Sequence, residues 1–327
     1  MKKYIELEKL KNIKSVCIIG HIDPDADALS SMITLKEFLK STFNINKVDL
    51  YAETENLPEI FLPIIENNKI NQSIKSYHTA IMIDTPNIER LGIYKTLFES
   101  AKLKIVIDHH DTNDLSGDIN IVEPCSSTCE IIYSILKYFK YNPSTKTQGK
   151  LYAGIITDTN NFTVGKFGKR TFKIASELIS NIDAEKIHKH FLATTTQRQM
   201  QLLSIAIQNL TSLNHGQILI SHITDNELKN FKATSEDCSI IINKLATIAN
   251  CKLVCFTYSK SGSYYVSMRA TQGFDVSSIA KENGGGGHVG AAAFNSDKKL
   301  FEIEEYIIKN FTKQLENKQR KTEKIFT

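Results

Sequence analysis

Residues 15–31 read SVCIIGHIDPDADALSS, and this stretch decides which class of fold the sequence predicts. Its apolar start, residues 15–20, has the length and composition of a buried strand. The next seven residues bring one imidazole and three carboxylates, those of His21, Asp23, Asp25 and Asp27. A helix is expected from Leu29 to Leu39. Because open α/β sheets bind ligands where strands end, this order predicts a strand, then a site, then a helix.

Two plainer interpretations of these aspartates fall short. A turn with helix-capping aspartates accounts for one or two of them, but not for so many charges, which repel one another unless cations are present. A calcium loop of the EF-hand type, counted from Asp23, needs glycine where Ala28 stands and glutamate where Thr34 stands. The stretch therefore predicts a cation site of another kind.

The same pattern returns in three later apolar segments. Residues 79–84 and 104–108 are expected to be strands that end in Asp84 and in Asp108-His109-His110, and the apolar segment 151–158 ends in Asp158. Because neighbouring strands lie only about 4.8 Å apart, such ends can meet in one cleft. The expected cluster is His21, Asp25, Asp27, Asp84, Asp108, His109, His110 and Asp158. Five carboxylates call for roughly two divalent ions, and mixed imidazole and carboxylate ligands suit manganese, iron, cobalt or zinc better than magnesium.

The order of elements predicts an α/β fold. Helices expected at residues 29–39, 87–101 and 129–139 alternate with the strands, which favours a mainly parallel sheet. Residues 170–213 have a helical pattern throughout. A second, smaller α/β unit follows, with strands at 217–223, 252–258 and 264–269, a glycine run at 284–287 and a helix from Leu300. We expect a catalytic domain at 1–190, a helical linker at 191–215, a second domain at 216–312 and a basic, fraying tail at 313–327.

Composition excludes some classes of protein and leaves others open. The chain has 327 residues, of which 41% are hydrophobic and 23% charged, so a disordered or fibrous protein is excluded. No apolar run is long enough to span a bilayer. A net charge of +4 is too small to indicate nucleic-acid binding by itself. The six cysteines lack the spacing of zinc or redox motifs and are expected to be reduced, half-buried thiols. We therefore expect a soluble, cytoplasmic protein.

Taken as a set, these motifs resemble those of a known family. His21-x3-Asp25-x-Asp27, Asp84, Asp108-His109-His110 with Asn113, and Thr157-Asp158-Thr159 look like the four motifs of the DHH phosphoesterase superfamily. The run from Gly284 to His288, followed by AAAF at 291–294, resembles the signature of the DHH-associated C-terminal domain. Length and domain content are similar to the NrnA-like branch of small oligoribonucleases and pAp phosphatases. Ala26 and Ser30 stand where the family prefers glycine.

The resemblance implies a role for each residue of the expected cluster. His21, Asp25 and Asp84 would hold one metal ion. A second ion would be held by Asp27, Asp84, His109 and Asp158, so that Asp84 bridges the two. His110 would face the scissile phosphate, and Asp108 would stand behind the ligands. The family's usual metal is manganese.

The second domain is expected to hold the substrate. The four glycines Gly284, Gly285, Gly286 and Gly287 leave backbone N–H groups open to a phosphate or a nucleobase, with His288 at the end of the run. A flexible linker has a similar composition, but the apolar AAAF that follows makes one less expected here. Arg269 resembles the family arginine that grips a terminal phosphate, although a surface arginine would look the same in sequence.

These observations predict a hydrolase with a binuclear metal centre. The resemblance implies that it cleaves short single-stranded RNA to mononucleotides and removes the 3′-phosphate of the nucleoside bisphosphate pAp. The alternatives are a phosphodiesterase for linear or cyclic dinucleotides such as pApA, a RecJ-like exonuclease for single-stranded DNA, and a nucleotide-sensing module without activity. No membrane partner is expected, and a homodimer stays open.

Overall fold

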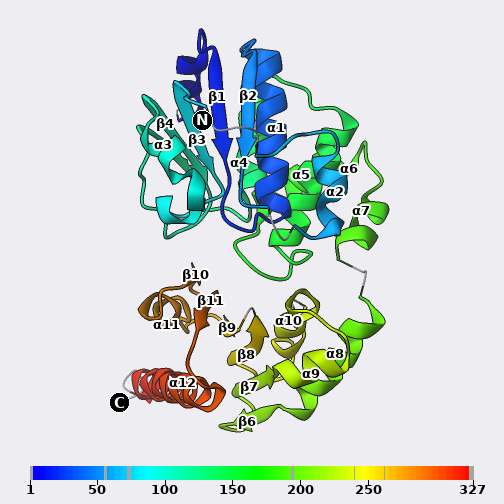
Figure 1. Cartoon of the computed structure of the whole chain (residues 1–327), viewed down its shortest axis with the longest axis vertical. Helices are drawn as coiled ribbons and strands as arrows, with labels where there is room; N and C mark the ends of the chain where they lie inside the picture. The colour runs from blue at the N-terminus through cyan, green and yellow to red at the C-terminus, as the bar shows by residue number, and fades with distance from the viewer. Residues whose placement is uncertain are drawn as a thin grey trace. The chain divides into compact units, whose positions relative to one another are not determined.

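A computed structural model describes residues 3–54, 57–71, 75–192, 195–238, 240–260 and 262–323 of the chain. The chain divides into two compact units, Met1–Thr194 and Thr195–Thr327 (Figure 1). Each unit is built around a sheet of its own. This mixed α/β architecture, with a parallel sheet in the first unit, confirms the predicted fold class.

The first unit contains a five-stranded sheet in which every neighbouring pair is parallel. Its strand order is β2-β1-β3-β4-β5. The strands are β1 (Ser15–Ile19), β2 (Lys47–Tyr51), β3 (Thr79–Ile83), β4 (Leu103–Asp108) and β5 (Ile119–Val122). Since all strands run in the same direction, their carboxyl ends share one edge of the sheet.

Helices cover both faces of this sheet. Residues of α1 (Ala26–Thr42), α4 (Thr128–Tyr138) and α5 (Thr145–Asp158) share one apolar core with the side chains of one face. The 3-10 helix η3 (Ile88–Tyr94) and α3 (Lys95–Glu99) pack on the other face, and Figure 1 shows α3 on the side opposite to α1 and α5. The remaining helices of this unit are η1 (Tyr4–Leu10), η2 (Glu59–Phe61), α2 (Leu62–Ile65), α6 (Lys169–Ile179) and α7 (Ala184–Phe191).

Side-chain caps decide where the three main helices begin. Asp25 accepts a hydrogen bond from the backbone N–H of Ala28, so α1 starts directly after it. Ser127 caps α4 and Ser144 caps α5 in the same way. The carboxylates of residues 25 and 27 are thereby held at the beginning of a helix, just beyond the end of β1.

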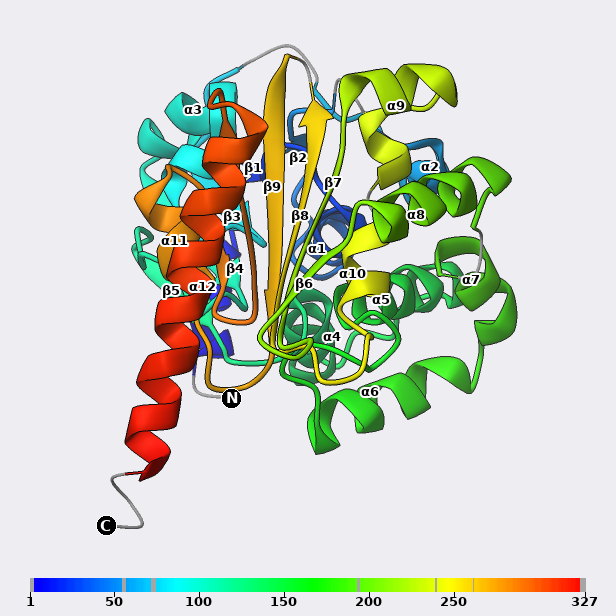
Figure 2. The ribbon, with the colours of Figure 1, turned by 90° about the horizontal axis from the view of Figure 1, so that it is seen from below.

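The second unit contains a six-stranded mixed sheet in the order β10-β11-β9-β8-β7-β6. Its strands are β6 (Thr211–Leu213), β7 (Ile218–Ile223), β8 (Leu253–Lys260), β9 (Ser263–Ala270), β10 (Gly286–His288) and β11 (Ala291–Ser296). Helices α11 (Ser277–Glu282) and α12 (Leu300–Glu323) pack on one face. On the other face lie α8 (Gln197–Gln208), α9 (Asp225–Asn230), η4 (Ser235–Cys238) and α10 (Ile241–Leu245), as Figure 2 shows for α12 and α8.

The structure corrects four local expectations. Residues 151–158 belong to helix α5 and not to a strand: Ser144 caps this helix, and its residues from Lys150 to Ile156 are all buried, so the apolar run shows no helical spacing. The expected helix at 87–101 is broken at Gly92, whose φ of 57° is not helical. Helix α8, expected in a linker, buries Leu202 and Ala206 in the core of the second unit. The expected fraying tail continues α12 as far as Glu323.

None of the helices in the described ranges has the length and apolar composition that a bilayer span requires.

Candidate metal centre

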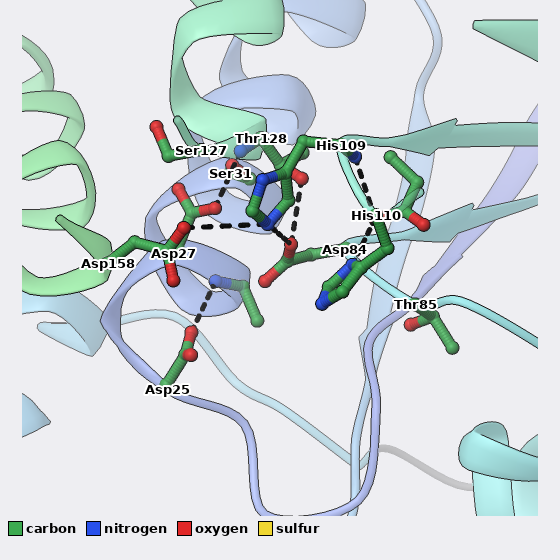
Figure 3. A network of polar contacts seen from close by, with 12 residues as sticks. Asp25, Asp27, Ser31, Asp84, Thr85, His109, His110, Ser127, Thr128 and Asp158 are labelled. Carbon is green, nitrogen blue, oxygen red and sulfur yellow. Dashed lines mark hydrogen bonds and ion pairs between the residues drawn. The ribbon is translucent and has the colours of Figure 1, made fainter. Parts of the chain in front are cut away.

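Eight predicted side chains come together where the strands of the first sheet end. His21 comes after β1, and Asp84 comes after β3. Asp108 is the last residue of β4, and His109 and His110 follow it. Asp25 and Asp27 stand at the start of α1, and Asp158 is the last residue of α5. Figure 3 shows Asp25, Asp27, Asp84, His109, His110 and Asp158 around one small volume. The structure therefore joins residues that lie far apart in the sequence.

Asp84 lies at the centre of this cluster. One of its carboxylate oxygens is 3.5 Å from Nε2 of His109, and the other is 3.8 Å from Nε2 of His21. Its carboxylate thus turns one oxygen to each histidine. The backbone φ of Asp84 is 53°, a conformation that few residues other than glycine and asparagine or aspartate adopt. Such backbone strain is concentrated at functional sites.

The potential ligands form two groups around Asp84. In the first, the ligand atoms of His21, Asp25 and Asp84 all lie within 4.8 Å of one another. In the second, those of Asp27, His109 and Asp158 do so, and Nε2 of His109 is 3.5 Å from Asp158. Each group offers imidazole nitrogen and carboxylate oxygen to a single point. These donors suit borderline divalent cations such as manganese, iron or zinc.

Electrostatics also favour cations at this place. Burial raises the pKa of Asp27 well above its ordinary range, and the charges of Asp84 and Asp158 raise it further. Burial and the neighbouring charges of Asp25 and Asp84 raise the pKa of Asp158 in the same way. Carboxylates that repel each other in a buried cluster are stabilised when positive ions lie between them. The residues present therefore fit divalent metal ions.

Two backbone carbonyls orient the imidazoles. Nδ1 of His21 is 2.8 Å from the carbonyl oxygen of Ile22, and Nδ1 of His109 is 3.3 Å from that of Cys125. Because a carbonyl can only accept, these contacts favour the tautomer in which Nδ1 carries the proton. Nε2, the nitrogen nearest to the carboxylates, keeps its lone pair for a metal ion.

Helix α4 holds Asp27 by its N-terminus. Backbone N–H groups of Thr128 and Cys129 donate to the two carboxylate oxygens of Asp27, at 2.6 and 2.9 Å. The hydroxyl of Thr128 also donates to Asp84, at 2.8 Å. A helix N-terminus stabilises negative charge. No pattern in the sequence pointed to these contacts of Thr128.

A second buried pair stands beside the ligands. Asp108 is fully buried and accepts hydrogen bonds from Nδ1 of His110 at 2.7 Å and from the side chain of Asn113 at 2.7 Å. Burial alone would lower the pKa of His110, but the hydrogen bond and charge of Asp108 outweigh it and raise that pKa to about 9. Burial would raise the pKa of Asp108, but its contact with His110 lowers it. Without metal ions, this contact favours a carboxylate on Asp108 and an imidazolium on His110.

Close packing of α5 places Asp158, the last residue of that helix. At Gly154, one turn earlier, a Cβ atom would lie 2.4 Å from Sγ of Cys129 and 2.9 Å from a carboxylate oxygen of Asp27. Only glycine lets α5 approach α1 and α4 this closely. No signal in the sequence distinguished this glycine from the others.

The position of Ala26 agrees with its residue type. Ala26 is the first residue of α1 and is not among the residues with positive φ. Alanine is therefore unstrained there, although the resembling family prefers glycine.

The glycine run of the second unit has two kinds of position. At Gly285 and Gly287 a Cβ atom would meet the backbone of β11 at 2.2 and 2.5 Å, so both positions need glycine for packing. Gly284 has a φ of 75°, which also favours glycine. Gly286 has no atom within 4 Å of a Cβ and is exposed. Part of the run pairs as β10 with β11, and His288 pairs with Ala291 at its end.

Arg269 is held inside the second unit and does not extend freely from the surface. Its guanidinium donates to the side chain of Asn243 at 3.1 Å and to the carbonyl oxygen of Met268 at 3.0 Å. Burial lowers its pKa. Within the described part of the chain, no carboxylate lies at ion-pair distance from this guanidinium. A partly buried cation without a counter-ion is a candidate anion site.

Known proteins resemble the chain along most of its length. The DHH family, N-terminal domain, matches residues 15–156, and the DHHA1 domain matches residues 215–317. The probable bifunctional oligoribonuclease and PAP phosphatase NrnA of Streptococcus mutans is 29% identical, over 89% of this chain and 92% of that protein. The bifunctional oligoribonuclease and PAP phosphatase NrnA of Bacillus subtilis is 26% identical, over 87% and 91%.

Solved structures support the fold. An exopolyphosphatase-related protein from Bacteroides fragilis superposes with a TM-score of 0.84 at 22% sequence identity. The superposition covers 97% of this chain and 96% of that one.

Proposed function

The chain belongs to the DHH family of metal-dependent phosphoesterases, with a DHHA1 domain in its second half, and we propose that it hydrolyses short oligoribonucleotides to mononucleotides and pAp to AMP. One observation carries the proposal: Asp84 turns one carboxylate oxygen to each of two imidazole and carboxylate groups. The names of the relatives, bifunctional oligoribonucleases and PAP phosphatases, agree with these substrates.

Six side chains would hold two divalent ions, which we propose to be manganese. His21, Asp25 and Asp84 would bind one ion, and Asp27, Asp84, His109 and Asp158 the other. When bound, such ions activate water and neutralise charge on phosphate oxygens. The N–H groups at the start of α4 fix the orientation of Asp27, and the hydroxyl of Thr128 fixes that of Asp84.

His110 would supply the protein's own proton. Asp108 holds its ring through Nδ1, Asn113 holds Asp108, and the contact with Asp108 raises the pKa of His110. An imidazolium in this position can donate to a phosphate oxygen or protonate the leaving oxygen. The DHHA1 domain would hold the rest of the substrate, with Arg269 at a terminal phosphate and the exposed Gly286, where a Cβ would meet no atom, beside a phosphate or base.

The cytoplasm is the compartment that we propose. All six cysteines are buried, and Cys17, Cys125, Cys129, Cys251 and Cys255 are free thiols. Proteins of oxidising compartments more often use such residues in disulfides.

Turnover of a substrate series with manganese tests this function. RNAs of two, five and twenty nucleotides, pAp, pApA and single-stranded DNA would be compared, with the parent, Asp84→Ala, His109→Ala and a control, His188→Ala on α7. We expect the parent and the control to prefer short RNA and pAp. The variants Asp84→Ala and His109→Ala should lose nearly all turnover while they keep the parent's circular dichroism.

Other outcomes would redirect the assignment. Preference for pApA over longer RNA and pAp would support a dinucleotide phosphodiesterase. Preference for single-stranded DNA would support a RecJ-like exonuclease. No turnover of any substrate would leave nucleotide sensing. Activity within a few-fold of the parent in either variant would refute the metal ligands.

A further inference from the structure

Three phenylalanine rings gather on the surface of the first unit. The ring of Phe172 lies 5.2 Å from that of Phe162 and 6.0 Å from that of Phe167, measured between centroids. Phe172 is 51% exposed and Phe167 is 36% exposed, whereas Phe162 is half-buried beneath them. Single exposed apolar residues are common, but contacting aromatic rings at the surface form a patch that usually has a partner. We call these three residues the phenylalanine platform.

The platform is tied to the metal centre from two sides. Phe162 follows Asp158 by four residues, so their Cα atoms lie at most about 14 Å apart. Lys166, between Phe162 and Phe167, forms an ion pair with the carboxylate of Asp111. Asp111 directly follows His110 in the sequence. The loop that carries two of the rings is thus joined to both segments that bring His110 and Asp158 to the centre.

The backbone of this loop is strained, and hydrogen bonds hold it in place. Asn160, Asn161 and Phe162 have positive φ angles of 43°, 57° and 59°. Asparagine tolerates this conformation, but a bulky aromatic residue rarely adopts it. Hydrogen bonds hold it in place: the N–H of Phe162 donates to the hydroxyl of Thr159 at 3.0 Å, and that of Thr163 to its carbonyl at 2.9 Å. Strain that the surroundings maintain in this way is typical of binding sites.

Three exposed lysines accompany the platform, one of which, Lys166, is paired with Asp111. Lys169 and Lys173, one turn apart on α6, flank Phe172 in the sequence and are exposed, as is Lys166. Proteins bind single-stranded nucleic acid by combining such cations, which follow the phosphates, with aromatic side chains on which bases stack. Rings held on a fixed loop are ordered before the ligand arrives, which reduces the entropic cost of binding.

We propose that the phenylalanine platform binds a nucleobase of the single-stranded RNA substrate, one or two nucleotides from the phosphate at the metal centre. The proposal rests on the proposed oligoribonuclease function and names a base-binding subsite in the first unit. Stacking on phenyl rings is tolerant of base identity, so the subsite would recognise that a nucleotide is present and not which one it is.

Kinetics of variants at Phe172 test the platform. The variants are Phe172→Ala, Phe172→Trp, which keeps an aromatic face, and Ile179→Ala, which removes another exposed apolar side chain from the same helix. The substrates are a five-nucleotide RNA, the same RNA with one base removed at each position in turn, and a fully abasic RNA of the same length, a phosphodiester with neither base nor aromatic ring. Since Phe172 is exposed, its variants are expected to fold, and urea unfolding would verify this.

We expect Phe172→Ala to raise KM for the intact RNA about tenfold, because base stacking contributes on this scale. Phe172→Trp and Ile179→Ala should stay within about twofold of the parent, and the phosphodiester without a base should be cleaved equally by all. At one position of the RNA, removal of the base should raise the parent's KM about as much as Phe172→Ala raises KM for the intact RNA. The two changes together should raise KM no more than either change alone.

The proposed function and base binding at the platform can be refuted separately. If the parent does not cleave RNA, the proposed function is wrong. If the parent cleaves RNA but Phe172→Ala leaves KM unchanged, base binding at the platform is refuted and the proposed function stands. The same conclusion follows if Phe172→Ala raises KM by the same factor for every base-deleted RNA. A change in the molecular mass of Phe172→Ala in sedimentation would overturn base binding in favour of a protein contact.

Discussion

Replacement of Gly154 by alanine tests how the metal centre is built. Helix α5 passes so close to α1 and α4 that a Cβ atom at this position would lie 2.4 Å from Sγ of Cys129 and 2.9 Å from Asp27. Ordinary Cβ contacts begin at 3.4 Å, so the distance to Cys129 is too short by a full ångström and the distance to Asp27 by half an ångström. Both neighbours are buried. Either α5 or Asp27 must therefore move.

The expected size of the effect follows from two opposing contributions. Overpacking of a tight core costs about 1–3 kcal/mol, and the higher helix propensity of alanine returns about 1 kcal/mol. Gly154→Ala should therefore lower the free energy of unfolding by up to about 2 kcal/mol. Gly149→Ala, on the same helix, meets only the flexible end of Ile187 at 3.3 Å. That control should be neutral or stabilising by up to about 1 kcal/mol.

Urea unfolding and calorimetric titration with manganese measure both consequences. Displacement of Asp27 should weaken manganese binding about 10- to 100-fold in Gly154→Ala, the loss typical when the support of a ligand is disturbed. Gly149→Ala should bind manganese like the parent. Adding Cys129→Ala to Gly154→Ala removes the shortest contact and should restore part of the stability. The reasoning is refuted if Gly154→Ala matches the Gly149→Ala control in both stability and manganese affinity.

Three further predictions concern other parts of the chain. Burial raises the pKa of the Cys17 thiol to about 12, and all six cysteines are buried. None of them should therefore react with a disulfide reagent at about pH 8 until the protein unfolds, and a rapid reaction in the folded protein would contradict their burial. The hydrogen bond to Glu304 raises the pKa of His222, so this pair stabilises the fold below about pH 6.5 and the stabilisation is lost as the pH rises through the folded pKa. In urea unfolding, His222→Gln should therefore lower the free energy of unfolding by about 0.5–1 kcal/mol near pH 5.5 and by little near pH 9, and an equal loss at both pH values would contradict the pairing. Gly285→Ala should destabilise by about 1–3 kcal/mol, whereas Gly286→Ala should fold normally and raise KM for short RNA; equal stability of the two variants would contradict the packing of the run.

Much of the fold could be predicted because its signals are local. Apolar runs followed by Asp or His identified the strands β1, β3 and β4 and the residues after them. The strands β2 and β5 were missed because Asp49 and Asn120 interrupt their apolar runs. Asp158 was placed correctly in the cluster but on the wrong element, since a short apolar run in a buried helix looks like a strand.

The support of the candidate site could not be predicted, because it depends on contacts between distant segments. Thr128 donates to Asp84 across 44 positions, and the N–H of Cys129 to Asp27 across 102. The need for glycine at position 154 also arises only when three helices are packed together. Sequence patterns reveal which side chains carry charge, and packing decides what holds them. The role of these side chains as metal ligands stays a prediction.

Calorimetric titration of the metal-free protein with manganese tests the central claim most directly, with Asp84→Asn measured beside the parent. Because Asp84 turns an oxygen to each ligand group, we predict two manganese ions per chain for the parent and weakened binding of both ions in Asp84→Asn. A single ion per chain in the parent, or two ions bound with unchanged affinity by Asp84→Asn, would contradict the account of Asp84 as the bridge.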